Sequence, residues 1–359
     1  MDNGHVRVEI FRQGRLLYSE HYNYERRTLD KDATAEMRIR PVLESYHQEI
    51  ISSLETLFEL SGIIYKEEHY LSHFRLGSIF LSLHIYDKAE EHILKSIDLN
   101  TKFYSAYIAL ARCYFFQKQY SRASQTLEPL VREQLSYPDM FNLLGMILLE
   151  QKDYVHALNQ LRFAIKLNPN YLEAYFNLLI GLVQRILILR TQDKNTEIQK
   201  NSDFLNILLK KIYKIGEAEE HLLLQKARQA LIKQNYSKIY SLVYDHRNKY
   251  FFQRAAPEIA GYEFELWFRY LPERLNTEML QYFENKLSLT LDNNPNYPDI
   301  WNYLAMIHLM LCRDDFLKGM EFFREATKMN PKFAKARKNL RLVENDGREF
   351  LSLIKAMIR

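Results

Sequence analysis

Two histidines near residue 70 have the spacing of metal ligands on a helix. His69 and His73 stand four positions apart, so a helix would place both imidazoles on one side. A protein metal site uses three or more side chains, and no third ligand stands close by in the sequence. His73 also shares its position with aromatic residues that recur at Tyr107, Phe141 and Tyr175. We therefore interpret His73 as a packing residue and predict neither a metal site nor a bound cofactor.

No other residues combine into a catalytic set. The adjacent Asp314 and Asp315 precede a predicted helix, where carboxylates accept hydrogen bonds from free backbone N–H groups. Cys113 stands next to the aromatic position of Tyr114 and is interpreted as a small buried side chain. The sequence contains neither a Gly-rich phosphate loop nor a Gly-x-Ser-x-Gly turn. We predict that the chain is not an enzyme.

A repeat of 34 residues dominates positions 70–170, and its elements must position any functional side chain there. Each unit has a leucine followed by a small residue, at Leu76-Gly77, Leu110-Ala111 and Leu144-Gly145. Each unit then has a tyrosine followed three positions later by an alanine, at Tyr86 and Ala89, Tyr120 and Ala123, and Tyr154 and Ala157. A fixed period of this length predicts stacked units that bury their apolar faces only against their neighbours.

This pattern resembles the tetratricopeptide repeat (TPR) family over residues 70–182, including the closing Asn168-Pro169. The resemblance implies an all-α fold, a right-handed superhelical solenoid of antiparallel helix pairs. The small residues let the two helices of a pair approach closely. In this family the first helices of successive repeats line a concave groove that receives a peptide or a helix. Such a fold does not by itself assign a chemistry.

By this resemblance, the groove side is mostly apolar. Its residues are Phe74, Ser78, Ile108, Arg112, Phe115, Asn142, Met146, Phe176 and Ile180. Family members that bind a chaperone C-terminus use Lys, Asn and Arg here, and only Arg112 and Asn142 match in type, so that activity is not predicted. An apolar peptide or an amphipathic helix fits better. Alanine at Phe115 and Phe176 is expected to weaken capture without unfolding the chain. In the alternative interpretation, the chain's own residues 33–60 cover this side.

The first residues follow a different pattern. Val6, Val8 and Ile10 alternate with polar or charged residues, and Gln13-Gly14 interrupts the alternation, which predicts a β-hairpin over residues 5–22. An isolated hairpin is marginally stable in water. It is expected either to pack on the helices that follow or to pair with a partner strand through its edge.

The remaining segments are predicted from helical periodicity and from its interruptions. In order, the chain divides into the N-terminal β-hairpin (1–30), a long helical segment that packs on the array (31–66), three regular TPR-like repeats and one irregular repeat (67–190), a polar insertion with an irregular helix (191–216), divergent TPR-like repeats (217–297), and a final repeat with C-terminal capping helices (298–359).

Several boundaries inside these segments are specific predictions. Pro41 is expected to separate two helices, and Gly62 to end the second. Residues 191–203 are expected to form an exposed insertion without fixed structure. The last repeat is expected to have a longer turn than the regular repeats, between Ala305 and Gly319.

Two helices are predicted at the end of the chain, over residues 332–344 and 348–358. The first is basic, with Lys332, Lys335, Arg337, Lys338 and Arg341. In one interpretation these residues form the solvated face of a capping unit. In the other they form a docking patch for a phosphorylated or anionic partner.

Composition favours a soluble intracellular chain. The 359 residues carry a formal net charge of +4, which is a weak pull toward anionic partners and does not favour specific nucleic-acid binding. Two cysteines, Cys113 and Cys312, stand far apart and predict reduced thiols without a disulfide framework. The first ten residues lack the apolar stretch of a secretory signal, and no membrane-spanning helix is predicted.

From these observations we predict a cytoplasmic, non-enzymatic scaffold that binds a peptide or an amphipathic helix of a partner protein in the TPR groove. The partner-binding residues are expected to be Phe74, Ile108, Arg112, Phe115, Asn142, Met146, Phe176 and Ile180. The alternative function is that of a structural subunit in a multiprotein assembly, which contacts its neighbours through the N-terminal hairpin and residues 183–216.

Overall fold

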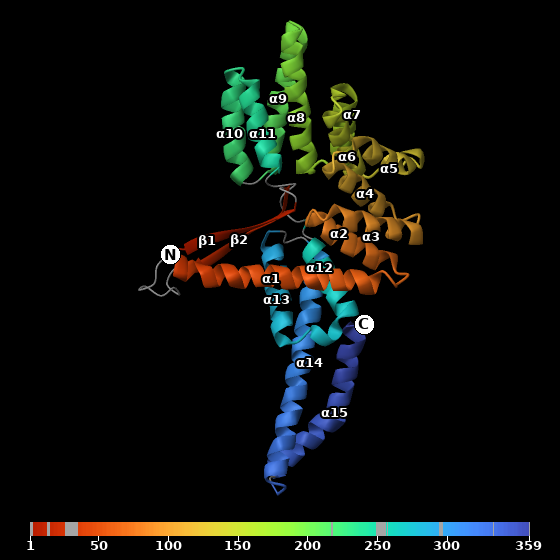
Figure 1. Ribbon diagram of the computed structural model, residues 1–359, viewed down its shortest axis with the longest axis vertical. Coiled ribbons are helices and arrows are strands. Elements are labelled where there is room, and N and C mark those ends of the chain that lie inside the picture. The colour runs from red at the N-terminus through yellow and green to blue at the C-terminus, as the bar shows by residue number, and fades with distance from the viewer. Residues whose placement is uncertain are drawn as a thin grey trace. The chain divides into compact units, whose positions relative to one another are not determined.

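Helices make up most of the fold in a computed structural model of the chain (Figure 1). The structure describes residues 3–12, 15–25, 35–216, 218–248, 256, 258–293, 297–332 and 334–358. The chain divides into two compact units. Unit 1 contains Met1–Val8, His21–Glu67 and Ala256–Arg359, and unit 2 contains Glu9–Glu20 and Glu68–Ala255.

Two strands lie near the N-terminus. β1 (Asn3–Arg12) and β2 (Arg15–Glu25) form a two-stranded sheet. Residues 13 and 14, where the sequence predicts the turn, lie outside the described residues.

Unit 2 begins with three helix pairs that fall where the 34-residue period predicts them. The pairs are α2 (Tyr70–Ser82) with α3 (Tyr86–Leu99), α4 (Tyr104–Phe116) with α5 (Tyr120–Arg132), and α6 (Pro138–Glu150) with α7 (Tyr154–Leu167). The helices within each pair pack on each other, and so do the first helices of neighbouring pairs. The predicted helical-repeat architecture is therefore confirmed.

The small residues of the repeat lie where two helices approach most closely. A Cβ atom on Gly77 would stand 2.6 Å from Cγ1 of Ile93, and one on Gly145 would stand 2.5 Å from Cγ of Leu161. Both distances are shorter than a non-bonded carbon contact, so the helix pairs close at this spacing only because the side chain is absent.

The turns inside the helix pairs also repeat. His84, Lys118 and Lys152 stand 34 residues apart and have φ angles of 59°, 61° and 65°. Two later turns, at Asp193 and Gln234, have φ angles of 54° and 49°. A left-handed residue after a helix reverses the chain in a few residues, so these positions set the antiparallel arrangement of each pair.

Residues 191–203 do not form the unstructured insertion that the sequence predicts. Instead, α8 (Leu172–Thr191) is followed by α9 (Asn195–Ile215), which packs on α8 as the second helix of a long pair. The polar residues at the start of α9 are consistent with an exposed first part of a helix, because its buried residues, Leu205, Leu208, Leu209 and Ile212, begin ten positions later.

The order of packing changes after α9. α10 (Ala218–Ile232) and α11 (Tyr236–Arg247) form the predicted divergent pair. In the regular repeats the first helix of one pair packs on the first helix of the pair before it. Here the second helix, α11, packs on α8, while α10 packs on α9.

α8 is long and apolar enough to cross a membrane by length and composition alone, which the sequence analysis did not predict. However, 67% of its most apolar window is buried inside the protein. Helices α7, α9 and α11 all pack on it, which accounts for its apolar character as the central helix of this part of the core.

Unit 1 contains the N-terminal long helix and the C-terminal helices. Its described elements after the strands are α1 (Ala35–Ile64), α12 (Glu258–Tyr270), the 3₁₀ helix η3 (Pro272–Arg274), α13 (Thr277–Asn293), α14 (Pro298–Met329) and α15 (Ala334–Ile358). Phe264 and Trp267 of α12 pack edge-on against Phe283 of α13, with ring centroids 5.4 and 5.7 Å apart. Arg274 pairs with both carboxylate oxygens of Glu59, at 2.7 and 2.8 Å, which ties α1 to η3.

Two boundaries predicted in α1 are wrong. The helix runs through Pro41 without a break, and it ends at Ile64, two residues beyond Gly62. Pro41 lies in the second turn, where the missing N–H removes one backbone hydrogen bond from a helix of 30 residues. The prediction that this segment packs on the array or covers the groove stays a prediction.

The C-terminal boundaries also differ from the prediction. α14 is one helix of 32 residues, with no turn between Ala305 and Gly319, and α15 is one helix instead of two. Asp314 therefore does not cap a helix; its carboxylate accepts hydrogen bonds from Arg313 at 2.8 and 3.0 Å. Apart from Gly319, the residues between Ala305 and Met320 include no strong helix breaker, so a continuous helix is the lower-energy choice.

Candidate functional site

The first helices α2, α4, α6 and α8 form a row in unit 2, because each packs on the next. We call the side of this row that carries the predicted groove residues the first-helix face. Three of the eight predicted binding residues, Phe74, Ile108 and Arg112, are partly exposed there. The other five are buried: Phe115 (6% exposed), Asn142 (1%), Met146 (4%), Phe176 (0%) and Ile180 (2%).

At its α8 end, the first-helix face is covered by the chain's own α11. The ring of Phe176 stacks on His246 with 4.8 Å between centroids. Ile239 and Val243 of α11 belong to the same buried apolar cluster as Ile180. A helix of this chain therefore occupies the position that the resemblance assigns to a partner helix. The expectation that alanine at Phe115 or Phe176 leaves the fold intact is corrected by their burial.

A buried chain of polar side chains joins the helices at this place. Asn142 of α6 donates through Nδ2 to Oε1 of Glu173 at 3.0 Å. Asn177 of α8 donates to Oδ1 of Asn142 at 2.9 Å, and Arg247 of α11 donates to Oδ1 of Asn177 at 3.4 Å. Asn142, Asn177 and Arg247 are 1%, 0% and 3% exposed, so each depends on its protein partners to replace water.

Charges of both signs surround this chain of polar groups. Burial raises the pKa of the Glu173 carboxyl, while Arg112 and the hydrogen bond from Asn142 act in the opposite direction. Burial lowers the pKa of Arg247, against the attraction of Tyr244 and Glu150. The Arg247 guanidinium also lies over the Tyr244 ring, 4.7 Å from its centroid. Ionisable groups of both signs therefore meet at the boundary between the covered and the partly exposed halves of the face.

Aromatic residues border the other end of the face. Phe103, in the loop before α4, lies edge-on to Tyr70 and Phe74 with centroids 5.1 and 4.9 Å away. Tyr104 and Tyr137 lie 6.4 Å apart across the next repeat. These ring contacts leave Phe74 and Phe103 partly exposed and Tyr137 41% exposed.

The two histidines considered as metal ligands face different partners. His69 caps α2, since its Nδ1 accepts from the backbone N–H of Ser72 at 3.3 Å. His73 is fully buried, and its Nδ1 lies 3.0 Å from Nδ1 of His92 on α3. The packing role predicted for His73 is confirmed. Within the described part of the chain, no three His, Cys, Asp or Glu side chains are arranged to hold a metal ion.

The residues of α11 that occupy the face are not among those predicted from the sequence. Asn177 is the one residue whose position in the sequence indicates such a contact. It is an amide in the middle of the apolar α8, and a buried amide needs a hydrogen-bond partner. The partner, Arg247, is 70 positions away and has no spacing relationship to the repeat.

Comparisons with known proteins find similar solved structures and add no function. No protein-family model matches the sequence, and no curated protein matches it as a relative. One similar solved structure is YrrB, described as a TPR protein with an unusual peptide-binding site (18% identity, TM-score 0.36, covering 54% of this chain and 94% of that one). Another is PilF of Pseudomonas aeruginosa, with 14% identity and a TM-score of 0.38, covering 66% of this chain and 96% of that one. A third is a thermophilic TPR protein of Thermus thermophilus, with 16% identity and a TM-score of 0.33, covering 67% of this chain and 100% of that one.

Likeness at this level carries no argument about what the chain binds. The repeat geometry inside the chain defines the class: a helical-repeat protein whose regular units are antiparallel helix pairs with a 34-residue period.

Proposed function

We propose that the chain is a non-enzymatic protein-interaction scaffold whose first-helix face holds a segment of a partner protein. The observation that supports this proposal is the contact with α11. The face already holds one helix by ring stacking on Phe176 and by hydrogen bonding to Asn177. A surface that binds an amphipathic helix at α8 has the chemistry to bind another along α2 and α4.

The partner segment is expected to lie over Ile108, with Phe74 and Arg112 on either side. An apolar side chain of the partner would pack on Ile108 and Phe74. A carboxylate of the partner would bind the Arg112 guanidinium, which already interacts with Glu173. A few anchors of this kind supply most of the binding energy of an interface. Both cysteines are free thiols, which supports the proposed cytoplasmic location.

Photocrosslinking in the native host tests this proposal without knowledge of the partner. A benzophenone amino acid is placed at Ile108 in one variant and at Val155 in a matched control. Val155 is 53% exposed on α7, the second helix of its pair. We expect a protein adduct from position 108 and none from position 155. Adducts from position 155 alone would place the partner elsewhere.

The structural-subunit alternative is supported by exposed apolar residues on α9 and α10. Ile207 and Tyr213 are 60% and 44% exposed, and Leu222 of α10 is 57% exposed. In this alternative, these residues and the N-terminal strands contact neighbouring subunits. The same crosslinker at Ile207 separates the two functions, because an adduct there without one at Ile108 supports the assembly role.

A further inference from the structure

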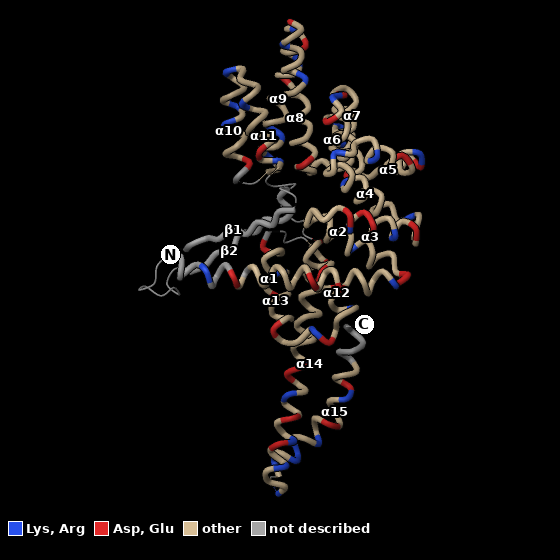
Figure 2. Tube along the Cα trace, viewed as in Figure 1, with Lys and Arg blue, Asp and Glu red and all other residues tan. Residues whose placement is uncertain are grey.

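The turn between α14 and α15 concentrates positive charge. Residues 316–342 include eight Lys and Arg and two Glu, a net charge of +6, which exceeds the +4 of the whole chain. The basic residues are Lys318, Arg324, Lys328, Lys332, Lys335, Arg337, Lys338 and Arg341, and all eight are exposed. Figure 2 shows them gathered toward the end of the hairpin that α14 and α15 form.

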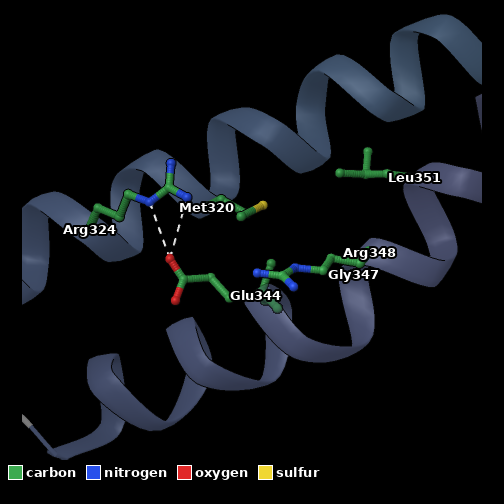
Figure 3. A pocket seen from close by; sticks show the side chains of 7 residues that line it. Met320, Arg324, Glu344, Gly347, Arg348 and Leu351 are labelled. Atoms are coloured by element: carbon green, nitrogen blue, oxygen red, sulfur yellow. Dashed lines mark hydrogen bonds and ion pairs between the residues drawn. The ribbon is translucent and has the colours of Figure 1, made fainter.

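Few of these charges are neutralised by nearby carboxylates. Arg324 pairs with Glu344 at 3.3 Å across the two helices, as Figure 3 shows, and Lys328 pairs with Glu325 at 3.4 Å. Among the described residues, no carboxylate lies within ion-pair distance of Lys332, Lys335 or Lys338, which stand at and just after the turn.

Large apolar side chains are exposed on the same hairpin. Met329, the last residue of α14, is 84% exposed, and Phe322 is 63% exposed. Leu342 of α15 is 49% exposed. α15 packs extensively only on α14 among the described elements, and no described residue between Met320 and Ala336 is buried. Figure 1 shows this hairpin running away from α12 and α13.

We propose that the turn of the α14–α15 hairpin docks on an anionic phospholipid surface. Clusters of four to eight Lys and Arg bind acidic headgroups, and each basic residue near the surface adds to the attraction. Met329 and Phe322 would insert among the headgroups and upper acyl chains, as apolar residues of interfacial helices do. A nucleic acid would use the lysines but not these apolar side chains.

The exposed apolar side chains favour a lipid surface over an acidic peptide. The carboxylates of a peptide would pair with the lysines alone, whereas a lipid surface also takes up Met329 and Phe322, which are 84% and 63% exposed. A hollow between α14 and α15 lies further along the hairpin. Its lining includes Met320, Gly347 and Leu351 and also the paired Arg324 and Glu344 (Figure 3).

Vesicle flotation with the full chain tests this docking. The probes are phosphatidylcholine vesicles with and without phosphatidylserine. We expect binding to the serine-containing vesicles only, and a loss of binding at high salt. The triple variant Lys332→Gln, Lys335→Gln, Lys338→Gln should weaken binding by about a hundredfold. The matched control is Lys210→Gln, Lys211→Gln, Lys214→Gln on α9, which removes three lysines of unit 2 and should bind as the unmodified chain does.

A second variant separates lipid from other anions. Phe322→Ser with Met329→Ser should weaken vesicle binding several-fold and leave binding to a duplex oligonucleotide unchanged. Circular dichroism checks that all variants fold. The proposal is overturned if the unmodified chain does not bind the anionic vesicles, or if both lysine triples reduce binding equally. It is also overturned if an oligonucleotide or a polyglutamate peptide binds more tightly than the vesicles at the same salt concentration.

Discussion

The aromatic ring of Phe176 in α8 lies stacked on the imidazole of His246 in α11, with their centroids 4.8 Å apart. The contact joins residues 70 positions apart and places α11 on the α8 end of the first-helix face. Phe176 is fully buried, whereas Phe163 of α7 is 38% exposed. The two rings therefore allow a matched comparison of what the covered end of the face contributes to stability.

Phe176→Ala should lower the free energy of unfolding by about 3–5 kcal/mol, because it leaves a cavity between α8 and α11. Phe163→Ala should cost about 1 kcal/mol, since part of the ring is already in water. Urea unfolding followed by circular dichroism measures both. Equal losses in the two variants would contradict the close packing of α11 on α8.

The buried His73–His92 pair predicts loss of stability in acid. Burial is the main cause that lowers the pKa of His92 from 6.5 to about 3, and His73 and Lys88 add to it. Below pH 6.5 the unfolded chain binds a proton that the folded chain does not bind. The free energy of unfolding should therefore fall by up to about 1.4 kcal/mol per pH unit between about pH 6.5 and 3, and should be independent of this group above that range.

His92→Phe should flatten this slope, even if the variant is less stable at neutral pH. His47→Gln serves as the control, because it removes a histidine that is exposed on α1. Thermal midpoints at several pH values provide the measurement. A slope that persists unchanged in His92→Phe would assign the pH dependence to other groups.

Gly145→Ala should destabilise the third helix pair. The added methyl group would stand 2.5 Å from Cγ and 2.7 Å from Cδ2 of Leu161, and 3.3 Å from the backbone oxygen of Ala157. Overpacking of this kind costs about 1–3 kcal/mol. Gly319→Ala is the matched control, since nothing lies within 4 Å of its added methyl group. That control should gain about 0.5–1 kcal/mol, because alanine favours a helix interior. Denaturant midpoints with the opposite signs would show that the helices do not approach as described.

The two thiols should react at very different rates. Cys113 is fully buried, and burial raises the pKa of its thiol to about 12, whereas Cys312 is exposed. Since the thiolate is the reactive form, a disulfide reagent at pH 8 should modify one thiol per native chain and two per unfolded chain. Cys312→Ser should remove the fast phase, and a fast phase that survives in this variant would mean that Cys113 is accessible.

The regular helix pairs could be predicted because their packing constraints are local and recur. Gly77 and Gly145 must be small, and the alanine after each tyrosine must be small, so the period is visible in the residues themselves. The aromatic position that His73 shares with Tyr107, Phe141 and Tyr175 follows from the same register, and it is buried at His73 and Tyr175. These features depend on neighbours within about one repeat, which is the range in which sequence patterns carry structural information.

The irregular parts could not be predicted for a physical reason. The hydrogen bond from Arg247 to Asn177 offsets the cost of burying two polar groups, and nothing in the sequence relates these two positions. In α14 the local residues decide against the repeat pattern. The pattern predicts a turn, but the residues there favour a helix and include no strong breaker, so the helix continues. The burial of Phe115, Met146 and Ile180 likewise depends on three-dimensional neighbours.

The turns of the three regular helix pairs share one backbone conformation, because His84, Lys118 and Lys152 are all left-handed. Each reverses the chain with nearly the same φ, and none is glycine, so each carries the small conformational cost of a left-handed side chain. Exchanging one connector for another should leave the melting temperature nearly unchanged, and glycine at all three positions should raise it. Substitution at these three turns would thus stabilise the helix pairs without changing any residue of the first-helix face.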